Sequence, residues 1–436
     1  MRRIFATLAI LVLAASWTSA AAPAKPKPGT KRPRRPPLQL VWHVETVDGR
    51  VVESGRGEEP INPASVVKVA TSMWALERLG PDFRFETRVF ARGTVDAARG
   101  VLKGDLVVQG GGDPDFHAEN AFLVADALNR MGVRQVTGAL VVNRTFWMGW
   151  ENGSQGTNPD ALQRGLTMAT RLRQALDPRR WSGATRAAWR DLAPRRGFDA
   201  ARPPRVQVLG GVGVDGQRSG DLLLVHRSGP LSGALRRFNS YSNNDIERIG
   251  ANLGPVEELA SLLRVRCDAA DGEISLETSS GLGVNRLSPR LVVRLLHEFR
   301  DTCGHVGIPV ESVLPVSGCG PGTVTRFYPQ LASGANATSV VGKTGTLTST
   351  DGGVSVLAGF VNTRDGDYAF CVAAPKAAGR LKSARVAEER WLVEFISRHG
   401  GPMPRACSAT VGDSDVEASV IVVGPRADPS ASTPAN

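Results

Sequence analysis

Hydrophobic and polar residues alternate along the chain in short stretches that predict strands, and between these stretches hydrophobic residues recur at helical spacing. Residues 38–53 alternate on both sides of Asp48-Gly49, which predicts a β-hairpin. Further strand-like stretches lie at 83–91, 102–109, 136–143, 206–209, 221–226, 339–347, 353–362 and 368–374. The last three follow one another with short polar turns, which predicts an antiparallel meander. Stretches with helical spacing lie at 63–79, 117–131, 230–238, 255–263, 287–300 and 382–398. This pattern predicts an α+β protein whose antiparallel sheet is flanked by helices.

The two ends of the chain depart from this pattern. Residues 1–22 combine Arg2-Arg3, a short apolar run and small residues, which is typical of a secretory signal peptide; a retained membrane anchor is the alternative. Residues 23–38 are rich in Pro, Lys and Arg, which predicts an extended linker. Residues 405–436 form a low-complexity tail with one apolar stretch at 418–423. We therefore expect an exported protein, periplasmic or associated with the cell wall, with no stable membrane span.

The length of the chain indicates more than one domain. At 436 residues it exceeds an average single domain. Residues 147–204 are rich in Gly, Arg and Trp and have weak periodicity, which is typical of an insert. We predict a main domain built from 39–90 and 205–404 and interrupted by an inserted domain at 91–204.

Ser65 and Lys68 are the first candidates for chemistry. Asn62 can cap a helix and Pro63 suits its first turn, so Ser65 and Lys68 are predicted to share one face at i and i+3. A lysine can activate a serine only if burial or another cation lowers the pKa of its amine. Lysine is scarce beside arginine, and this is the only Ser-x-x-Lys in the chain. The spacing alone also fits the solvated start of an ordinary helix.

Composition and motifs argue against several other classes of function. The net charge of +11 favours polyanions such as cell-wall polymers, but no nucleic-acid-binding motif accompanies it, so no nucleic-acid partner is expected. The six histidines are scattered and no Gly-x-Ser-x-Gly is present, which disfavours a serine–histidine mechanism. No spacing resembles a metal site, and Gly110-Gly111-Gly112 lacks the residues of a phosphate-binding loop. We expect neither a metal nor an organic cofactor.

The cysteines leave the disulfide pattern open. Export permits disulfides, but five cysteines leave at least one thiol unpaired within the chain. Cys303–Cys319 is one candidate pair. Cys371 lies in an apolar stretch, so we expect it to be a buried small hydrophobe.

Two further stretches fit a lysine-based serine mechanism. Ser242-x-Asn244 lies between helical segments, where the hydroxyl can relay a proton and the amide can hold a substrate amide, although Ser and Asn are also common in ordinary turns. Lys343-Thr344-Gly345-Thr346 lies on the first strand of the meander. Lys343 and Thr344 offer a cation and a hydroxyl for a substrate carboxylate, and Gly345 permits close approach to the strand. Lys343 near Lys68 would also lower the pKa of Lys68.

Ser-x-x-Lys, Ser-x-Asn and Lys-Thr-Gly in this order form the set of motifs used by penicillin-recognising serine enzymes. The chain resembles the D-alanyl-D-alanine carboxypeptidase/endopeptidase family, the class C low-molecular-mass penicillin-binding proteins, over roughly residues 40–400. Besides the three motifs, the stretches that resemble this family are 63–85, 104–114, 280–289 and 314–318. The resemblance implies a serine β-lactamase/DD-peptidase-like fold with a helical subdomain and an inserted domain.

The resemblance also implies a function and a role for each motif residue. Peptidoglycan stem peptides are the expected substrates and β-lactams the expected acylating inhibitors. Ser65 is the implied nucleophile and Lys68 its base, with Ser242 and Asn244 in proton relay and substrate positioning. Lys343 and Thr344 are implied in binding the terminal carboxylate. The remaining implied groups are on the backbone. Gly345 would allow the substrate to approach closely, and the N–H groups of Ser65 and Thr346 would form the oxyanion hole.

Three departures from the family keep alternatives open. The distance from Ser65 to Ser242 is short, so part of the insert is expected to be missing. Tyr241 stands where the family often has a lysine, and Glu247 stands where a small apolar residue is expected. The alternatives are a non-catalytic wall-binding protein with this fold, or a β-lactamase or esterase of the fold. The Glu-x-x-Leu-Asn motif of class A lactamases is absent from the sequence.

Overall fold

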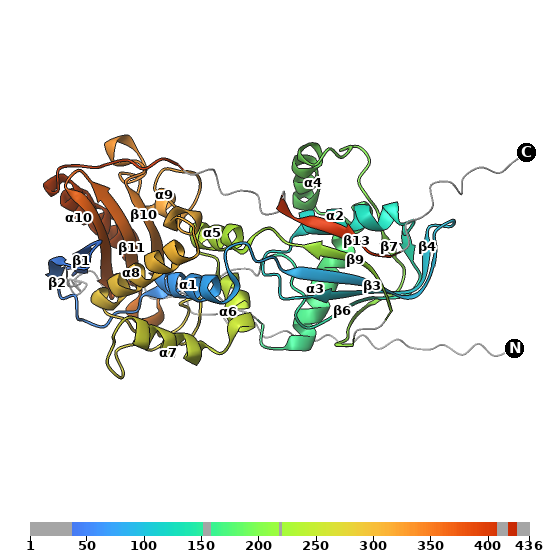
Figure 1. Ribbon diagram of the computed structural model, residues 1–436, viewed down its shortest axis with the longest axis horizontal. Helices are drawn as coiled ribbons and strands as arrows, with labels where there is room; N and C mark the ends of the chain where they lie inside the picture. Colours follow the sequence, from blue (N-terminus) through green and yellow to red (C-terminus); the bar gives the residue numbers. More distant parts are fainter. Residues whose placement is uncertain (1–36, 151–157, 218–219, 408–416, 425–436) are drawn as a thin grey trace, which may run out of the picture. The chain divides into compact units, whose positions relative to one another are not determined.

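In the described part of the chain, two β-sheets with separate hydrophobic cores organise the fold (Figure 1). The structure, a computed structural model, describes residues 37–150, 158–217, 220–407 and 417–424. The described residues from Leu38 onwards belong to one compact unit. The predicted signal peptide and nearly all of the predicted linker lie outside the described residues.

The first sheet is antiparallel, and its described strands lie in the order β10-β11-β12-β1-β2. These strands are β1 (Val41–Thr46), β2 (Val51–Gly55), β10 (Val340–Leu347), β11 (Val354–Thr363) and β12 (Gly366–Pro375). The predicted hairpin is confirmed as β1 and β2, and the predicted meander as β10 to β12. Because β12 pairs with β1, residues from both ends of the main domain meet in one sheet and leave β10 as its end strand.

Alternation along the strands gives this sheet two buried faces. On β11, Val356 and Ala358 belong to the core that also contains α1 (Val67–Leu79) and α8 (Pro289–His305). Leu357, between them, belongs to the core on the side of α10 (Leu381–Arg398). Successive side chains of a strand point to opposite faces, so a continuous apolar run is required for a sheet covered on both sides.

A group of helices surrounds α1 beside the sheet. Besides α8, the described helices that contact α1 include α5 (Leu231–Tyr241), α6 (Glu247–Leu253) and α7 (Val256–Arg266). A short helix, α9 (Thr323–Phe327), contacts both α5 and β10. These helices correspond to the predicted helical subdomain. Among the described helices, none combines the length and hydrophobicity needed to cross a bilayer.

The second sheet has the described strand order β13-β9-β3-β4-β5-β7, with β6 and β8 attached through β4. Its strands are β3 (Glu86–Asp96), β4 (Val101–Gly110), β5 (Gln135–Val136), β6 (Leu140–Val142), β7 (Gln207–Val208), β8 (Val212–Val214), β9 (Asp221–Arg227) and β13 (Ser419–Val422). The helices of this part are α2 (Ala118–Arg130), α3 (Ala161–Ala175) and α4 (Gly183–Arg195).

The second sheet does not follow the predicted insert boundaries of 91 and 204. It begins in β3 at Glu86 and continues to the end of β9 at Arg227. It also takes β13 from the predicted tail, because β13 pairs with β9. Periodicity predicts that a stretch is a strand, but the hydrogen-bonding partner decides which sheet the strand joins.

The disulfide in the described residues links Cys319 to Cys407. The candidate pair Cys303–Cys319 is therefore wrong, because Cys303 lies on α8 inside the core. Cys371 is buried, as expected, and so is Cys267. Burial raises the pKa of the Cys267 and Cys303 thiols to about 12, which makes both poor nucleophiles.

Candidate active site

Ser65 lies in a tight turn that leads into α1. The side chain of Asn62 accepts a hydrogen bond from the N–H of Ala64 at 3.1 Å, which holds the turn. Ala64 has a φ of 48°, and a 3-10 turn over Ala64–Val66 precedes the helix. Lys68 follows one turn later and is fully buried, whereas Ser65 is half-buried. The predicted i, i+3 pair is therefore confirmed as a pair of contacting side chains.

Lys68 makes three short contacts. Its Nζ lies 2.8 Å from Ser65 Oγ, 2.8 Å from Asn244 Oδ1 and 2.7 Å from the carbonyl oxygen of Ser280. Burial lowers the pKa of Lys68 to about 7, although the nearby Glu247 carboxylate acts in the opposite direction. At neutral pH a large fraction of the amine is therefore uncharged.

Ser242 and Lys343 form a second contacting pair. Ser242 ends α5 in the left-handed conformation, with a φ of 56°, and its Oγ accepts a hydrogen bond from Lys343 Nζ at 2.8 Å. Lys343 also donates to the carbonyl oxygen of Thr344 at 2.8 Å. Burial, followed by the charge of Lys68, lowers the pKa of Lys343 well below its usual value. Burial is the largest cause of the lowered pKa of Lys68, and an effect of the Lys343 charge on Lys68 stays a prediction.

The strand β10 brings Lys343 to Thr346 against the turn of Ser65. A Cβ atom on Gly345 would lie 2.5 Å from the carbonyl oxygen of Pro63, so the strand can approach this closely only with glycine. The hydroxyl of Thr344 donates to Thr323 Oγ1 at 2.8 Å. The predicted residues of all three motifs therefore meet in one place.

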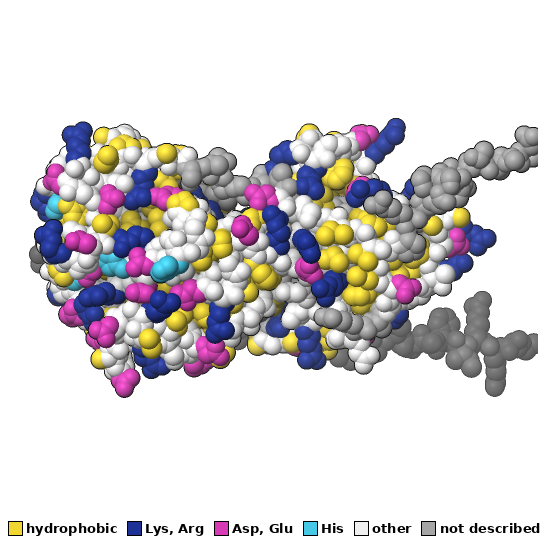
Figure 2. All heavy atoms as spheres, viewed as in Figure 1, with side chains coloured by type: hydrophobic (Ala, Val, Ile, Leu, Met, Phe, Trp, Pro, Cys, Tyr) yellow, Lys and Arg dark blue, Asp and Glu magenta, His cyan; other side chains and the backbone are white. Residues whose placement is uncertain are grey.

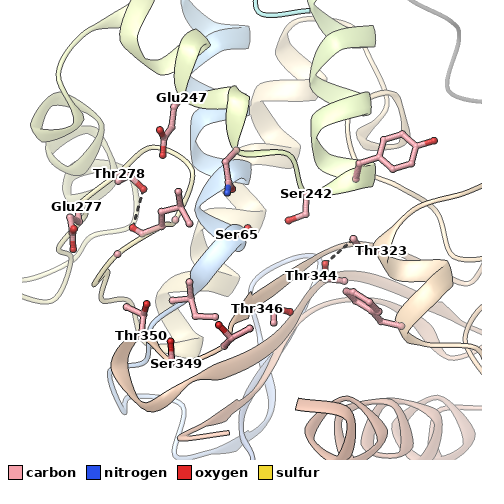
Figure 3. A pocket seen from close by; sticks show the side chains of 18 of the residues that line it. Ser65, Ser242, Glu247, Glu277, Thr278, Thr323, Thr344, Thr346, Ser349 and Thr350 are labelled. Atoms are coloured by element: carbon pink, nitrogen blue, oxygen red, sulfur yellow. Dashed lines mark hydrogen bonds between the residues drawn. The ribbon is translucent and has the colours of Figure 1, made fainter. Parts of the chain in front are cut away.

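These residues open onto a cavity of about 710 Å³, which Figure 3 shows from close by. Of the predicted residues, those that line it are Ser65, Ser242, Asn244, Thr344 and Thr346. Lys68 and Lys343 are fully buried and reach the cavity through their serine partners. Gly345 does not line the cavity but sets the spacing between β10 and the turn of Ser65.

Sequence reasoning did not single out several residues that line the cavity. Among them are Thr323, Arg326 and Phe327 of α9 and Arg385 of α10. Thr323 lies in a stretch without clear periodicity, and Arg385 lies on a helix whose pattern predicted packing only. Within the described residues, no group of three or more His, Cys, Asp or Glu side chains could hold a metal ion.

Comparison with known families agrees with this geometry. A model of the D-Ala-D-Ala carboxypeptidase 3 (S13) family matches residues 39–168 and 205–392. The chain belongs to this family. Membership identifies the protein as a serine peptidase, a hydrolase that acts on peptidoglycan. It confirms the resemblance stated from the motifs.

Curated relatives of the S13 family are similar to this chain over different lengths. "Carboxypeptidase DacB" of Mycolicibacterium smegmatis is 26% identical over 363 residues, covering 73% of this chain and 74% of that protein. The D-alanyl-D-alanine carboxypeptidase of Actinomadura sp. is 38% identical over 104 residues, which is 24% of this chain and 19% of that protein.

Solved structures confirm the predicted fold class. The "Bd0816 Predatory Endopeptidase" of Bdellovibrio bacteriovorus has a TM-score of 0.73 at 20% identity, covering 87% of this chain and 100% of that chain. Penicillin binding protein 4 of Haemophilus influenzae has a TM-score of 0.59 at 19% identity, covering 82% of this chain and 96% of that chain.

Proposed function

We propose that this protein is an exported serine DD-peptidase. It would cleave the D-Ala-D-Ala bond of stem peptides as a carboxypeptidase, or D-Ala cross-links as an endopeptidase, through an acyl-Ser65 intermediate that water hydrolyses. The observation that carries this proposal is the position of Lys68 Nζ, 2.8 Å from both Ser65 Oγ and Asn244 Oδ1. Export rests on the predicted signal peptide at residues 1–22, and the location would be the periplasm or the cell wall.

Lys68 acts as the base during acylation. A neutral amine has two N–H donors and one lone pair. Asn244 Oδ1 and the carbonyl oxygen of Ser280 can only accept, so they take the two N–H groups and leave the lone pair facing Ser65 Oγ. Ser65 gives its proton to this lone pair as its oxygen attacks the substrate carbonyl carbon.

Ser242 and Asn244 act on the substrate across the cavity. Collapse of the tetrahedral intermediate needs a proton on the leaving nitrogen, and the Ser242 hydroxyl, held by Lys343, is the group that relays it. The Oδ1 atom of Asn244 is occupied by Lys68, so its amide nitrogen is left for a substrate carbonyl group. Lys343 and Thr344 contribute to binding the terminal carboxylate.

The outer edge of β10 supplies the oxyanion donor. The N–H of Gly342 donates to the carbonyl oxygen of Pro315, on the side of β10 away from β11, at 3.0 Å. Alternate N–H groups of a strand share one edge, so those of Thr344 and Thr346 face the same way. We assign the N–H groups of Ser65 and Thr346 to the oxyanion hole.

Solved relatives support β-lactams as acylating inhibitors of this site. One is the penicillin G acylated Bd3459 endopeptidase of Bdellovibrio bacteriovorus, with a TM-score of 0.68 at 21% identity, covering 85% of this chain and 96% of that chain. The penicillin binding protein 4 of Haemophilus influenzae is also known as a β-lactam complex. The route proposed above uses side chains, backbone groups and water alone.

Fluorescent penicillin labelling tests this function. The signal-cleaved protein should take up about one equivalent of label, and Ser65→Ala should take up none. Folded wild-type protein that stays unlabelled would instead favour a non-catalytic wall-binding protein. In a labelled protein, release of D-Ala from a pentapeptide indicates a peptidase, whereas rapid turnover of penicillin without D-Ala release indicates a β-lactamase.

A further inference from the structure

Arg385 is a cavity-lining residue that the mechanism above does not use. It lies on the second turn of α10, and its Nη2 atom donates to Thr346 Oγ1 at 3.0 Å. Its guanidinium carbon lies 3.6 Å above the centre of the Phe327 ring. The Thr346 hydroxyl and the Phe327 ring therefore hold the guanidinium beside β10, the strand that carries the Lys-Thr-Gly motif.

No carboxylate of the described residues lies within 4.0 Å of the Arg385 nitrogens, and burial lowers the pKa of Arg385, an effect that the buried Glu388 opposes only from a longer distance. Asp351, which follows the cavity-lining residue Thr350, is by contrast paired with Arg286 at 2.8 Å. The buried Nε atom of Arg385 also has no acceptor. A half-buried guanidinium without an anion is costly, so the site is suited to an anion that arrives with a ligand.

The nearest acidic side chain on the same helix is directed elsewhere. Glu388 is fully buried one turn after Arg385. Its Oε2 atom accepts hydrogen bonds from Tyr328 at 2.7 Å and from Ser355 at 2.8 Å. Ser355 stands opposite Thr346 in the register of β11 and β10. These contacts fix α10 against the sheet and so fix the position of Arg385 relative to Thr346.

Lys343, to which a contribution to carboxylate binding is assigned above, does not present its charge directly to the cavity. Lys343 is fully buried, does not line the cavity and already donates to Ser242 and to a backbone carbonyl. An arginine stays charged at any pH that a protein tolerates, and its planar group can bind both oxygens of a carboxylate. Arg385 is therefore the better match for a full negative charge.

We propose that Arg385 binds the α-carboxylate of the residue on the leaving side of the scissile bond, together with Thr346. This inference rests on the proposed peptidase function and names a specificity determinant of the same site. The ligand class is a peptide whose leaving amino acid carries a free α-carboxylate. The ring carboxylate of a β-lactam has the same chemistry.

Arg326 provides a matched comparison for this proposal. Its guanidinium also lies over the Phe327 ring, at 4.5 Å, and it also lines the cavity. It differs in two respects: Arg326 is exposed, and no hydrogen bond joins it to β10 among the described residues. If contact with β10 decides which arginine takes the carboxylate, the two variants must behave differently.

The test compares two peptides that differ only in charge, an N-acyl tripeptide ending in D-Ala-D-Ala and its C-terminal amide. For each enzyme, the ratio of kcat/KM for the acid to kcat/KM for the amide is measured. We expect Arg385→Gln to lower this ratio about tenfold or more. Arg326→Gln and Arg390→Gln, the latter at an exposed position of α10, should keep it within about twofold. Arg385→Lys should give an intermediate ratio.

Two outcomes would overturn the proposal. One is an acid-to-amide ratio for Arg385→Gln that stays within about threefold of the wild-type ratio. The other is a tenfold fall of this ratio in Arg326→Gln instead of in Arg385→Gln. Binding of both peptides to Ser65→Ala, with and without Arg385→Gln, gives the same comparison by calorimetry without turnover. A protein that binds the acid selectively through Arg385 but cleaves neither peptide would contradict the proposed function and leave this inference standing.

Discussion

Lys68 is the residue whose protonation controls the proposed chemistry. Burial lowers its pKa to about 7, and only the neutral amine has a lone pair for the Ser65 proton. The rate constant for penicillin acylation should therefore rise with pH through about 7. Lys68→Arg cannot supply a neutral base, so acylation should fall by about 10²–10⁴-fold with little change in melting temperature. A flat pH profile, or an arginine variant within about tenfold of the wild type, would exclude Lys68 as the base.

A substitution of Glu247 tests the electrostatic environment of Lys68. Its carboxylate raises the pKa of Lys68 against the effect of burial. Glu247→Gln removes that charge, so the midpoint of the acylation pH profile should move to lower pH. Glu277→Gln is the matched control, because Glu277 also lines the cavity but is absent from the groups that influence Lys68. Equal shifts in both variants would show that the effect is not specific to Glu247.

At the scale of residues, the motifs predicted the groups that carry local signals. Ser65 and Lys68 are joined by helical spacing, and the glycine of Lys-Thr-Gly follows from the close approach of a strand. Thr323 and Arg385 contact the same strand from elements distant in sequence. No rule of sequence spacing connects such residues to the strand, so only the three-dimensional structure identifies them as part of the site.

At the scale of elements, one buried carboxylate joins β1 to α8. Both oxygens of Glu45 are bound, one to His43 Nε2 and one to His297 Nε2, each at 3.0 Å. Figure 2 shows histidine, acidic and basic side chains gathered on the part of the surface around α8. Burial alone would raise the pKa of Glu45, but the bonds from His297 and His43 outweigh it and lower the pKa to about 2. Glu45 therefore stabilises the fold in its charged form.

This linkage predicts a pH-dependent effect of Glu45→Gln. A carboxylate whose pKa is depressed in the folded state contributes stability above its unfolded pKa, and this contribution is lost as pH falls through about 4.5 towards 2. The variant should be less stable by about 1–3 kcal/mol at pH 7, and the difference should shrink with acidification. Chemical denaturation at several pH values measures it. Glu59→Gln, at an exposed ion pair, should show almost no difference at any pH, and a pH-independent loss in Glu45→Gln would contradict the linkage.

Periodicity predicted the positions of most helices and strands, but it did not predict which strands pair with each other. The predicted stretches at 63–79 and 117–131 contain α1 and α2, and the stretch at 382–398 covers all of α10 except its first residue. The stretch at 136–143 instead lies across two short strands, β5 and β6, which pair with different parts of β4. Register and partner depend on contacts between distant residues, which an alternation of polar and apolar positions does not encode.

At the scale of the whole molecule, the residues after the main domain remain attached to the fold. Arg405 bonds to the backbone of Thr338, Cys407 is linked to Cys319, and β13 pairs with β9 at the edge of the second sheet. Cys319 precedes α9, which supplies Thr323 and Phe327 to the cavity wall. The disulfide spans 88 positions that include β10, β11, β12 and α10.

This disulfide should make a large contribution to stability and a small one to the site. Closing a long loop restricts the unfolded chain, so Cys319→Ser with Cys407→Ser should lower the free energy of unfolding by about 2–4 kcal/mol. Penicillin labelling should persist, because the Thr323–Thr344 bond and the core hold the cavity wall independently of the disulfide. Reduction of the wild type should bring its melting temperature down to that of the double variant, which should itself not respond to reductant. If the melting temperature of the oxidised wild type equalled that of the double variant, the covalent link would not be what stabilises this part of the molecule.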